Sequence, residues 1–291
     1  MLKNKFFNFC LIFSSLFISS CASTASITNL TDPNIPRYAD TNIVKPAPQA
    51  NKTIKIVSFN IELCNKLVAA GKLLHNNKDL DNADILCLQE MTPEGAKYLA
   101  DTLRYNYVYY PSAIHPKNKK YFGQAILSKW PIRSDKKINL PYAQKDKYLK
   151  LHRNAVYATV LINDTEILVI CAHLGVIISP LRRKNQLETI IKHIPNSANN
   201  VIICGDFNTY CQIHIKAINE ILDEYGFKNA TIKLGATYTR WYLLNQGFTM
   251  DHIFFKGMKL IKAGKIKSKG SSDHMPIWAE FTNFNSSKQL K

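Results

Sequence analysis

The chain alternates short apolar runs with amphipathic stretches from about residue 52 to residue 281. Runs at 54–60 and 84–90 have the composition of β-strands, and the second is apolar enough to be buried on both faces. The same pattern predicts strands at 123–129, 155–163, 166–173, 201–206, 251–255, 260–267 and 275–281. It predicts helices at 93–103, 180–193 and 213–225. Because strands and helices mix without a break in composition, we expect one α/β domain over residues 52–283 and a short tail at 284–291.

Composition agrees with a folded chain. Hydrophobic residues make up 46% of the 291 residues and aromatic residues 11%, which excludes disorder as the main state. Only 11 residues are glycine, which excludes a collagen-like chain, and no heptad repeat persists. The formal net charge of +17 favours an anionic partner, either nucleic acid or a membrane surface.

Residues 1–20 resemble a signal peptide. Lys3 and Lys5 precede an apolar stretch at 6–18, whose 13 residues are too few to span a bilayer. Small residues then lead to Cys21, as in a bacterial lipoprotein, where the cysteine is lipidated and becomes the mature N-terminus. The alternative is an ordinary cleaved signal in which Cys21 has no role. In both cases we expect export, and lipidation would anchor the protein to a membrane of the bacterial cell envelope, periplasmic or surface-exposed.

The segment at 21–51 is rich in Ser, Thr, Asn, Ala and Pro. Such a segment cannot bury enough surface to offset the entropy of ordering it. We therefore expect a flexible tether here, with a coil reach of roughly 30 Å. No later run approaches the length of a membrane-spanning helix, so the domain beyond the tether is expected to be soluble.

Polar side chains that bind cations or carry protons follow many of the apolar runs. Strand ends border the clefts in which α/β enzymes place their sites. Any one of these residues could simply end a strand, but together they supply carboxylate, amide and imidazole groups at several strand ends. Carboxylate and amide oxygens are typical ligands of Mg²⁺ or Mn²⁺. The residues are Asn60, Glu90, His173, Asp206, Asn208, Asp251, Asp273 and His274.

These positions lie in motifs that resemble the endonuclease/exonuclease/phosphatase superfamily, which includes deoxyribonuclease I, neutral sphingomyelinases and inositol polyphosphate 5-phosphatases. The resemblance covers about residues 52–281 and implies an α/β fold. That fold is a four-layer sandwich of two mixed β-sheets flanked by helices, with the site at one edge. The motifs are SFNI (58–61), LQEM (88–91), AILSKWPI (125–132), AHL (172–174), GDFNT (205–209), MDHIF (250–254) and SDHMPI (272–277). GDFN and SDH-x-P are the most specific of them.

The resemblance implies a metal site and a water-positioning pair. Glu90 matches the principal metal carboxylate, Asn60 lends a second oxygen, and Asp273 aligns with an aspartate at the metal site. The implied cofactor is Mg²⁺, with Mn²⁺ as an alternative. Asp206 and Asn208 match the pair that positions the attacking water and contacts the phosphoryl group.

The resemblance also implies roles for two histidines. His274 matches the histidine that acts as general base or phosphate-stabilising acid, and Asp251 matches the carboxylate that orients it. His173 matches a donor to a phosphate oxygen, although a structural histidine at a strand end is a competing interpretation. Arg153 could bind a phosphate or could be a surface residue. His252, next to Asp251, is expected to be structural, and Trp130 is expected to pack in the core.

Two basic stretches bear on the substrate. Residues 104–153 hold 12 basic and 2 acidic side chains with tyrosines interleaved. The stretch 256–269 holds six lysines and no acidic residue, and it is expected to be a solvated basic edge, which does not favour a particular substrate. Cations mixed with aromatic residues suit nucleic acid, whose bases stack on aromatic rings. Arg240 and Trp241 lie where nucleases of the family carry an aromatic loop near the sugar, and we expect both to contact substrate.

We therefore expect a Mg²⁺-dependent, extracytoplasmic phosphodiesterase that acts as a monomer and cleaves nucleic acid, as an endonuclease or exonuclease. The lipoprotein signature favours an alternative within the superfamily, a phospholipid or sphingomyelin phosphodiesterase or an inositol-phosphate phosphatase. A more distant alternative is a non-catalytic binding module, which would have lost some of the metal and proton-transfer positions. None of these positions is missing here.

The cysteines do not form a disulfide framework. Apart from Cys21 and one in the signal, five remain, and three of those lie inside apolar strands, where a free thiol behaves as a small hydrophobic group. We expect free buried thiols. A bridge between Cys64 and Cys211 is the one alternative.

Overall fold

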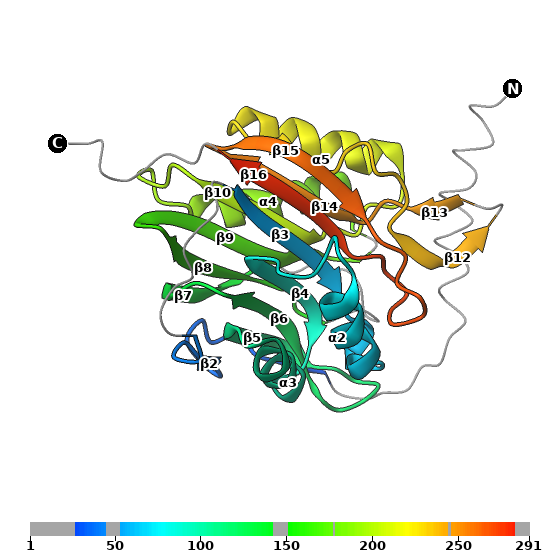
Figure 1. Ribbon diagram of the computed structural model, residues 1–291. Coiled ribbons are helices and arrows are strands. Elements are labelled where there is room, and N and C mark those ends of the chain that lie inside the picture. Colours follow the sequence, from blue (N-terminus) through cyan, green and yellow to red (C-terminus); the bar gives the residue numbers. More distant parts are fainter. Residues whose placement is uncertain (1–26, 45–52, 142–150, 177, 244–245, 283–291) are drawn as a thin grey trace, which may run out of the picture.

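The computed structural model describes residues 27–44, 53–141, 151–176, 178–243 and 246–282. They form two large β-sheets, four α-helices and a small hairpin. The hairpin pairs β12 (Tyr238–Leu243) with β13 (Gln246–Phe248) and extends from one end of the molecule (Figure 1). A short 3-10 turn, η2 (Glu62–Cys64), follows the first long strand.

The first sheet has eight strands, in the order β1-β5-β6-β4-β3-β16-β15, with β2 also paired to β5. Its central strands β3 and β4 run parallel, whereas their neighbours on both sides are antiparallel. The sheet is therefore mixed. Its strands are β1 (Thr28–Asn29), β2 (Tyr38–Asp40), β3 (Thr53–Asn60), β4 (Ile85–Met91), β5 (Asn106–Ile114), β6 (Tyr121–Ser128), β15 (Lys259–Lys265) and β16 (Ile277–Thr282).

The second sheet has six strands, in the order β11-β14-β10-β9-β8-β7. Strands β9 and β10 run parallel at its centre and the remaining pairs are antiparallel, so this sheet is mixed as well. Its strands are β7 (Ile132–Asn139), β8 (Asn154–Ile162), β9 (Thr165–His173), β10 (Val201–Asp206), β11 (Lys228–Asn229) and β14 (Asp251–Lys256).

The two sheets pack face to face between two pairs of helices. The central core joins side chains of both sheets, such as Ile85 of β4 and Val169 of β9. Helices α2 (Leu67–Asn76) and α3 (Pro93–Leu103) cover the outer face of the first sheet, and α4 (Pro180–Lys192) and α5 (Gln212–Glu224) cover that of the second. Figure 1 shows the two helix pairs on opposite sides of the molecule. The expected four-layer sandwich is confirmed.

The expected helices begin where the sequence indicates. The Thr92 hydroxyl accepts the N–H of Gly95 ahead of α3, and the Ser179 hydroxyl accepts that of Arg182 ahead of α4. Each helix then starts with a proline. A backbone N–H at the first helical position has no partner within the helix, so a residue without this N–H loses no hydrogen bond there. The local sequence therefore fixes both entry points.

The tyrosines in and next to strand β5 do not have the role that we expected from the sequence. Tyr105, Tyr107, Tyr109 and Tyr110 are at most 6% exposed, and Tyr109 donates its hydroxyl proton to the carbonyl of Met91. These rings fill the core and the helix-covered face of the first sheet, so they cannot stack on nucleic-acid bases. The aromatic part of the argument for nucleic acid is therefore wrong for these four tyrosines.

Residues 27–44 differ from the flexible tether that we expected over 21–51. Strands β1 and β2 both pair with β5, and Arg37 forms a two-pronged ion pair with Asp135 at 2.7 Å. Lys137 adds hydrogen bonds to the carbonyls of Leu30 and Ile35. Backbone pairing to an otherwise open sheet edge orders a segment whose composition alone would not. The proposed signal and Cys21 lie outside the described residues.

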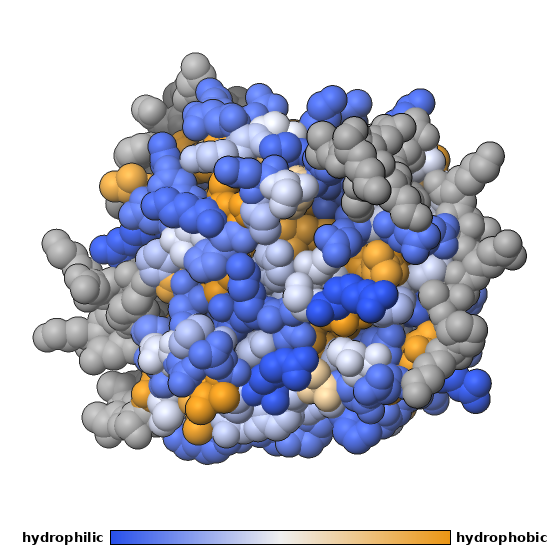
Figure 2. All heavy atoms as spheres, turned by 90° about the vertical axis from the view of Figure 1, so that its left-hand side faces the viewer, coloured by the Kyte–Doolittle hydropathy of each residue, from blue (hydrophilic) through white to orange (hydrophobic). Residues whose placement is uncertain are grey.

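The surface on the side shown in Figure 2 is mostly hydrophilic, with hydrophobic side chains in small scattered groups. On that face no broad apolar area suggests a docking partner. Among the helices that the structure describes, none is long and apolar enough to cross a membrane.

Candidate active site

The parallel strand pairs bring the polar strand ends together. Asn60 and Glu90 lie at the carboxyl ends of β3 and β4, and His173 and Asp206 lie at the same ends of β9 and β10. Asp251 begins β14, which runs antiparallel to β10 and pairs residue by residue with it at Asp206. A hydrogen bond of 3.1 Å from Asn60 Nδ2 to Asp206 Oδ2 joins the two sheets. The site therefore lies across the sandwich at one edge.

Gly205 allows Asp206 to reach this position. Its φ of 142° is in a region that favours glycine, and an added Cβ would lie 1.9 Å from the carbonyl oxygen of Ala172 on the neighbouring strand. The backbone of β10 can thus approach β9 closely just before Asp206. The glycine of the GDFN motif is a steric requirement.

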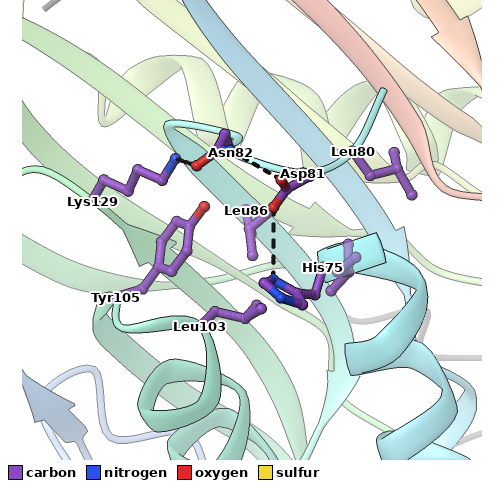
Figure 3. Close-up of a pocket in the computed structure, with 9 residues that line it drawn as sticks. His75, Leu80, Asp81, Asn82, Leu86, Leu103, Tyr105 and Lys129 are labelled. Carbon is purple, nitrogen blue, oxygen red and sulfur yellow. Dashed lines mark hydrogen bonds and ion pairs between the residues drawn. The ribbon is translucent and has the colours of Figure 1, made fainter. Parts of the chain in front are cut away.

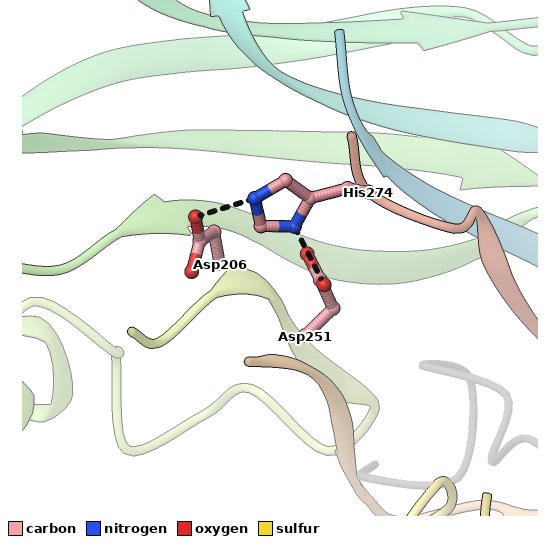
Figure 4. Close-up of side chains that lie close together, drawn as sticks. All are labelled: Asp206, Asp251 and His274. Atoms are coloured by element: carbon pink, nitrogen blue, oxygen red, sulfur yellow. Dashed lines mark hydrogen bonds and ion pairs between the residues drawn. The ribbon is translucent and has the colours of Figure 1, made fainter. Parts of the chain in front are cut away.

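A histidine lies between two carboxylates at the centre of the site (Figure 4). His274 Nδ1 is 2.9 Å from Asp251 Oδ2, and His274 Nε2 is 3.7 Å from Asp206 Oδ2. All three residues are at most 5% exposed. Because a carboxylate only accepts, the short bond requires the proton on Nδ1, which directs Nε2 toward Asp206.

Burial and charge set the proton affinities of this group. Burial lowers the pKa of His274, but the charges of Asp251 and Asp206 outweigh it and raise that pKa to about 10. Burial raises the pKa of Asp206 to about 7, opposed by His274 and assisted by Asp251. A carboxylate whose pKa lies near neutrality beside an imidazolium can exchange protons during a reaction.

His173 and Arg153 form a second pair beside Asp206. His173 Nε2 is 3.4 Å from Asp206 Oδ2, and Arg153 contacts both ring nitrogens of His173 at 3.0 and 3.1 Å. Burial and the charge of Arg153 hold the pKa of His173 well below its ordinary value. The guanidinium also stacks over the ring of Phe122 at 5.1 Å. Arg153 is therefore part of the site and not an isolated surface residue.

A bulge in β4 reorients Glu90. The register between β4 and β6 shifts between Leu88 and Met91, and Glu90 adopts a left-handed φ of 58°. Burial raises the pKa of Glu90, whereas Arg153 and His274 lower it. The Glu90 carboxylate is therefore near enough to Arg153 and His274 for their charges to act on it.

The oxygen donors at this edge suit a hard divalent cation. The Asn60 side chain lowers the pKa of Glu90, and the charge of Asp273 raises the pKa of both Glu90 and His274, so these groups lie near one another. Asp206, Asp251 and His274 also place one ligand atom each within 4.8 Å of the others. Asp251 Oδ1 is buried and accepts no hydrogen bond from any of the described residues. Mg²⁺ takes carboxylate and amide oxygens as ligands, so these side chains could hold it.

Asn208 is held by partners on three sides. Its backbone, with φ 51°, donates N–H to Asp206 Oδ1 at 2.8 Å, and its Nδ2 donates to the carbonyl of Leu174 at 3.0 Å. The hydroxyl of Tyr210 donates to its Oδ1 at 3.0 Å. Asn208 is therefore fixed in one orientation next to Asp206.

Sequence reasoning missed Tyr210 and Arg183. The Arg183 guanidinium is 1% exposed and donates to the carbonyl of Phe207 in the GDFN turn, and burial lowers its pKa to about 10. A helix residue 22 positions before the turn gives no local signal of this contact. Tyr210, next to GDFNT, could have been suspected from its position alone.

The other residues singled out are placed as follows. His252 is fully buried between Thr209 and Asn229, as expected of a structural histidine, and Trp130 is in the core. Arg240 and Trp241 belong to β12, but their side chains are not described. The five cysteines of the described residues, Cys64 and Cys211 included, are free.

A separate cavity of about 160 Å³ opens between α2, α3 and the amino end of β4 (Figure 3). Leu80, Leu86 and Leu103 form its apolar wall, and His75 and Lys129 lie at its polar side. Glu90 is at the opposite end of β4. The cavity therefore does not belong to the site described above.

Solved structures with the same fold come from several organisms. They include an endonuclease/exonuclease/phosphatase family protein from Leptotrichia buccalis, with 19% identity, a TM-score of 0.63 and coverage of 78% of this chain and 99% of that one. D. rerio TDP2 in complex with a single-strand DNA product has 18% identity and a TM-score of 0.63, covering 80% of this chain and 100% of that one. A mannosyl-6-phosphatase from Bacteroides thetaiotaomicron has 18% identity and a TM-score of 0.60, covering 79% and 99%.

Sequence relatives include a UPF0294 protein of Vibrio vulnificus, 27% identical over 146 residues, which are 48% of this chain and 49% of the relative. A UPF0294 protein of Yersinia pseudotuberculosis is 26% identical over 147 residues, which are 48% and 53%. The chain thus spans about half the length of the curated relatives it matches. The family profile described as Endonuclease/Exonuclease/phosphatase matches residues 57–274. With the motifs, the sandwich and the site in agreement, the chain belongs to the Endonuclease/Exonuclease/phosphatase family.

Proposed function

We propose that the protein is a Mg²⁺-dependent phosphodiesterase that hydrolyses nucleic acid outside the cytoplasm. The assignment as a hydrolase rests on the surroundings of Asp206. Its Oδ2 lies 3.4 Å from His173 Nε2 and 3.7 Å from His274 Nε2, and Glu90 is close by. Displacement at phosphorus needs an oriented water, charge stabilisation of the phosphoryl oxygens and a proton carrier.

Each of these three requirements can be assigned to particular residues of the site. Asp206, at a pKa near 7, would orient the attacking water and accept its proton. His274, kept protonated by Asp251, and Arg153 would donate hydrogen bonds to the phosphoryl oxygens. Glu90, with the oxygens of its neighbours, would hold the Mg²⁺. When bound, the cation supplies Lewis-acid stabilisation of charge on the phosphate ester.

The charge around the pocket supports a polyanionic substrate. Lys117, Lys119 and Lys120 are exposed in the turn between β5 and β6, at the edge that carries Glu90. Lys267 and Lys269 are exposed in the loop that leads to His274. Exposed cations on two segments that lead to the acidic site would bind phosphates that flank the scissile bond. The solved TDP2 complex contains a single-strand DNA product, which agrees with this substrate class.

The test is a substrate panel with the purified domain, 27–291, in Mg²⁺ and in EDTA. Plasmid DNA, single-stranded DNA, RNA, sphingomyelin and a phosphoinositide are offered in parallel. We expect cleavage of nucleic acid in Mg²⁺ that EDTA abolishes. Release of lipid headgroups alone would replace nucleic acid by the second candidate, a lipid phosphodiesterase, which the lipoprotein signature favours. No hydrolysis of any phosphate ester would overturn the enzymatic assignment.

The lipid anchor is a separate proposal with its own prediction. Changing Cys21 to Ser is expected to move the full-length protein from the membrane fraction to the soluble fraction, because a serine cannot be lipidated. Immunoblots of fractionated cells measure this. Cys64→Ser is the matched control, since that thiol is partly buried beside Met91 and should not affect fractionation. Unchanged fractionation of the Cys21 variant would argue against lipidation.

A further inference from the structure

A buried hydroxyl at the base of the β12–β13 hairpin contacts the centre of the site. Thr237 is 1% exposed, and its Oγ1 lies 2.6 Å from Asp251 Oδ2. The same oxygen accepts the backbone N–H groups of Met250 at 3.0 Å and Asp251 at 3.1 Å. A hydroxyl has two acceptor sites and one proton. Because two amides occupy the acceptor sites, the proton must go to Asp251 Oδ2.

Two donors thus meet on one carboxylate oxygen. Asp251 Oδ2 accepts the hydroxyl proton of Thr237 and the Nδ1–H of His274, at 2.6 and 2.9 Å. The other oxygen of Asp251 is buried and accepts no hydrogen bond within the described part of the chain. The hydroxyl therefore selects which oxygen faces the imidazole and fixes the rotation of the carboxylate.

The backbone of Thr237 is fixed to both sides of this pair. Its N–H donates to the carbonyl of Phe248 at 2.8 Å, and its carbonyl accepts the N–H of Met275 at 2.7 Å. The next residue, Tyr238, forms an isolated bridge with His274 and packs its ring edge-on against the imidazole, with centroids 4.9 Å apart. The base of the hairpin is thus joined to the two chain segments that carry Asp251 and His274.

We propose that Thr237 is a positioning residue that aligns the Asp251–His274 pair for phosphoester hydrolysis. This inference rests on the proposed function for its kinetic consequence, but its structural consequence can be measured without any substrate. Without the hydroxyl, Asp251 is free to turn its other oxygen toward His274. The Nε2 of His274 then loses its fixed direction toward Asp206 and the phosphoryl group. Outer partners of this kind contribute about 10- to 100-fold to the function of the groups they orient.

The kinetic test compares three variants. Thr237→Val removes the hydroxyl, Thr237→Ser keeps it, and Thr231→Val is the matched control. Thr231 is also 1% exposed and also accepts an N–H of β14, from Ile253 at 3.0 Å, but its hydroxyl bonds to Asn229 and not to the Asp251–His274 pair. With bis(p-nitrophenyl) phosphate and Mg²⁺, we expect kcat of Thr237→Val to fall about 10- to 100-fold while KM changes less than about 3-fold. Thr237→Ser and the control should keep kcat within about 3-fold of the parent.

The second readout is the proton on His274 Nδ1, observed by NMR. A hydrogen bond to a buried carboxylate shifts this proton downfield and protects it from exchange, and His274→Gln identifies the signal by removing it. We expect the signal to shift or disappear in Thr237→Val and to persist in Thr237→Ser and Thr231→Val. Should the valine variant not fold, Thr237→Ala, which leaves room for water, is judged by the same criteria.

The outcomes separate this inference from the proposed function. A signal that responds to Thr237→Val in a protein that hydrolyses no phosphate ester would uphold the positioning role and reject the activity. An unchanged signal together with unchanged kcat in Thr237→Val would overturn the positioning role and leave the activity intact. Equal losses in Thr237→Val and Thr231→Val would also overturn it, because they would show a general effect on β14.

Discussion

Replacing Asp206 with asparagine is expected to lower kcat for bis(p-nitrophenyl) phosphate by about 10³-fold or more. The aspartate lies between two histidines, and its pKa of about 7 suits it to take a proton from water. An amide of the same size cannot accept that proton. It does retain an oxygen for the N–H of Asn208, so the turn can keep its shape. Steady-state kinetics in saturating Mg²⁺ measure the loss.

The matched control for this variant is Asp84→Asn. Asp84 is also a partly buried carboxylate whose pKa is raised by burial, and it accepts hydrogen bonds from the Lys55 N–H and the Trp130 indole. It lies just before the amino end of β4, away from the site. This control should retain kcat within about 3-fold of the parent. If Asp206→Asn retained kcat within about 10-fold, the role given to Asp206 would be wrong.

Glu90→Gln is expected to have a comparably large effect through the metal. The variant should lose about 10³-fold of its Mg²⁺-dependent hydrolysis, because a neutral amide binds a hard cation far less well than a carboxylate does. Calorimetric titration of Mg²⁺ into the protein measures binding directly and should show at least about a 10-fold weaker affinity. Full hydrolysis with Mg²⁺ as the sole metal would contradict the assignment of Glu90.

Glu94→Gln provides the control for the metal experiment. Glu94 is an exposed residue in the first turn of α3, four positions after Glu90. Its substitution removes the same charge without removing a carboxylate from the pocket. Mg²⁺ affinity and kcat should both stay within about 2-fold of the parent, since surface charges have small effects.

The sequence predicted elements whose signals are local and missed those without such signals. Thr92 and Pro93 mark the start of α3, which begins at Pro93 as expected. Helix α2 begins after Lys66, which provides no side-chain cap, and was not anticipated. Strand β7 was missed because it is an edge strand rich in polar residues, two of them exposed. Strand β5 was missed because Pro111 interrupts its pattern at a bulge.

The site was predictable as a set of residues but not as an arrangement. The motifs place Asp251 and His274 in the chain, and the structure brings them within 2.9 Å. The contact of Arg183 with the GDFN turn and that of Thr237 with Asp251 join residues on separate elements. Neither residue type is distinctive in a sequence, because arginine and threonine usually lie on surfaces. Both contacts become visible only when α4 and the β12–β13 hairpin are seen packed against the strand ends.

The first described strand has a consequence for where catalysis would take place. Thr28 of β1 pairs with Ile114 at the edge of the sheet that carries Glu90, and Asn29 accepts the N–H of His152, next to Arg153. If Cys21 is lipidated, the few residues before Ile27 can extend at most about 20 Å. The candidate site would then be confined to a thin layer above the bilayer. Local concentration within that layer, more than affinity in bulk solution, would decide which phosphate esters the enzyme cleaves.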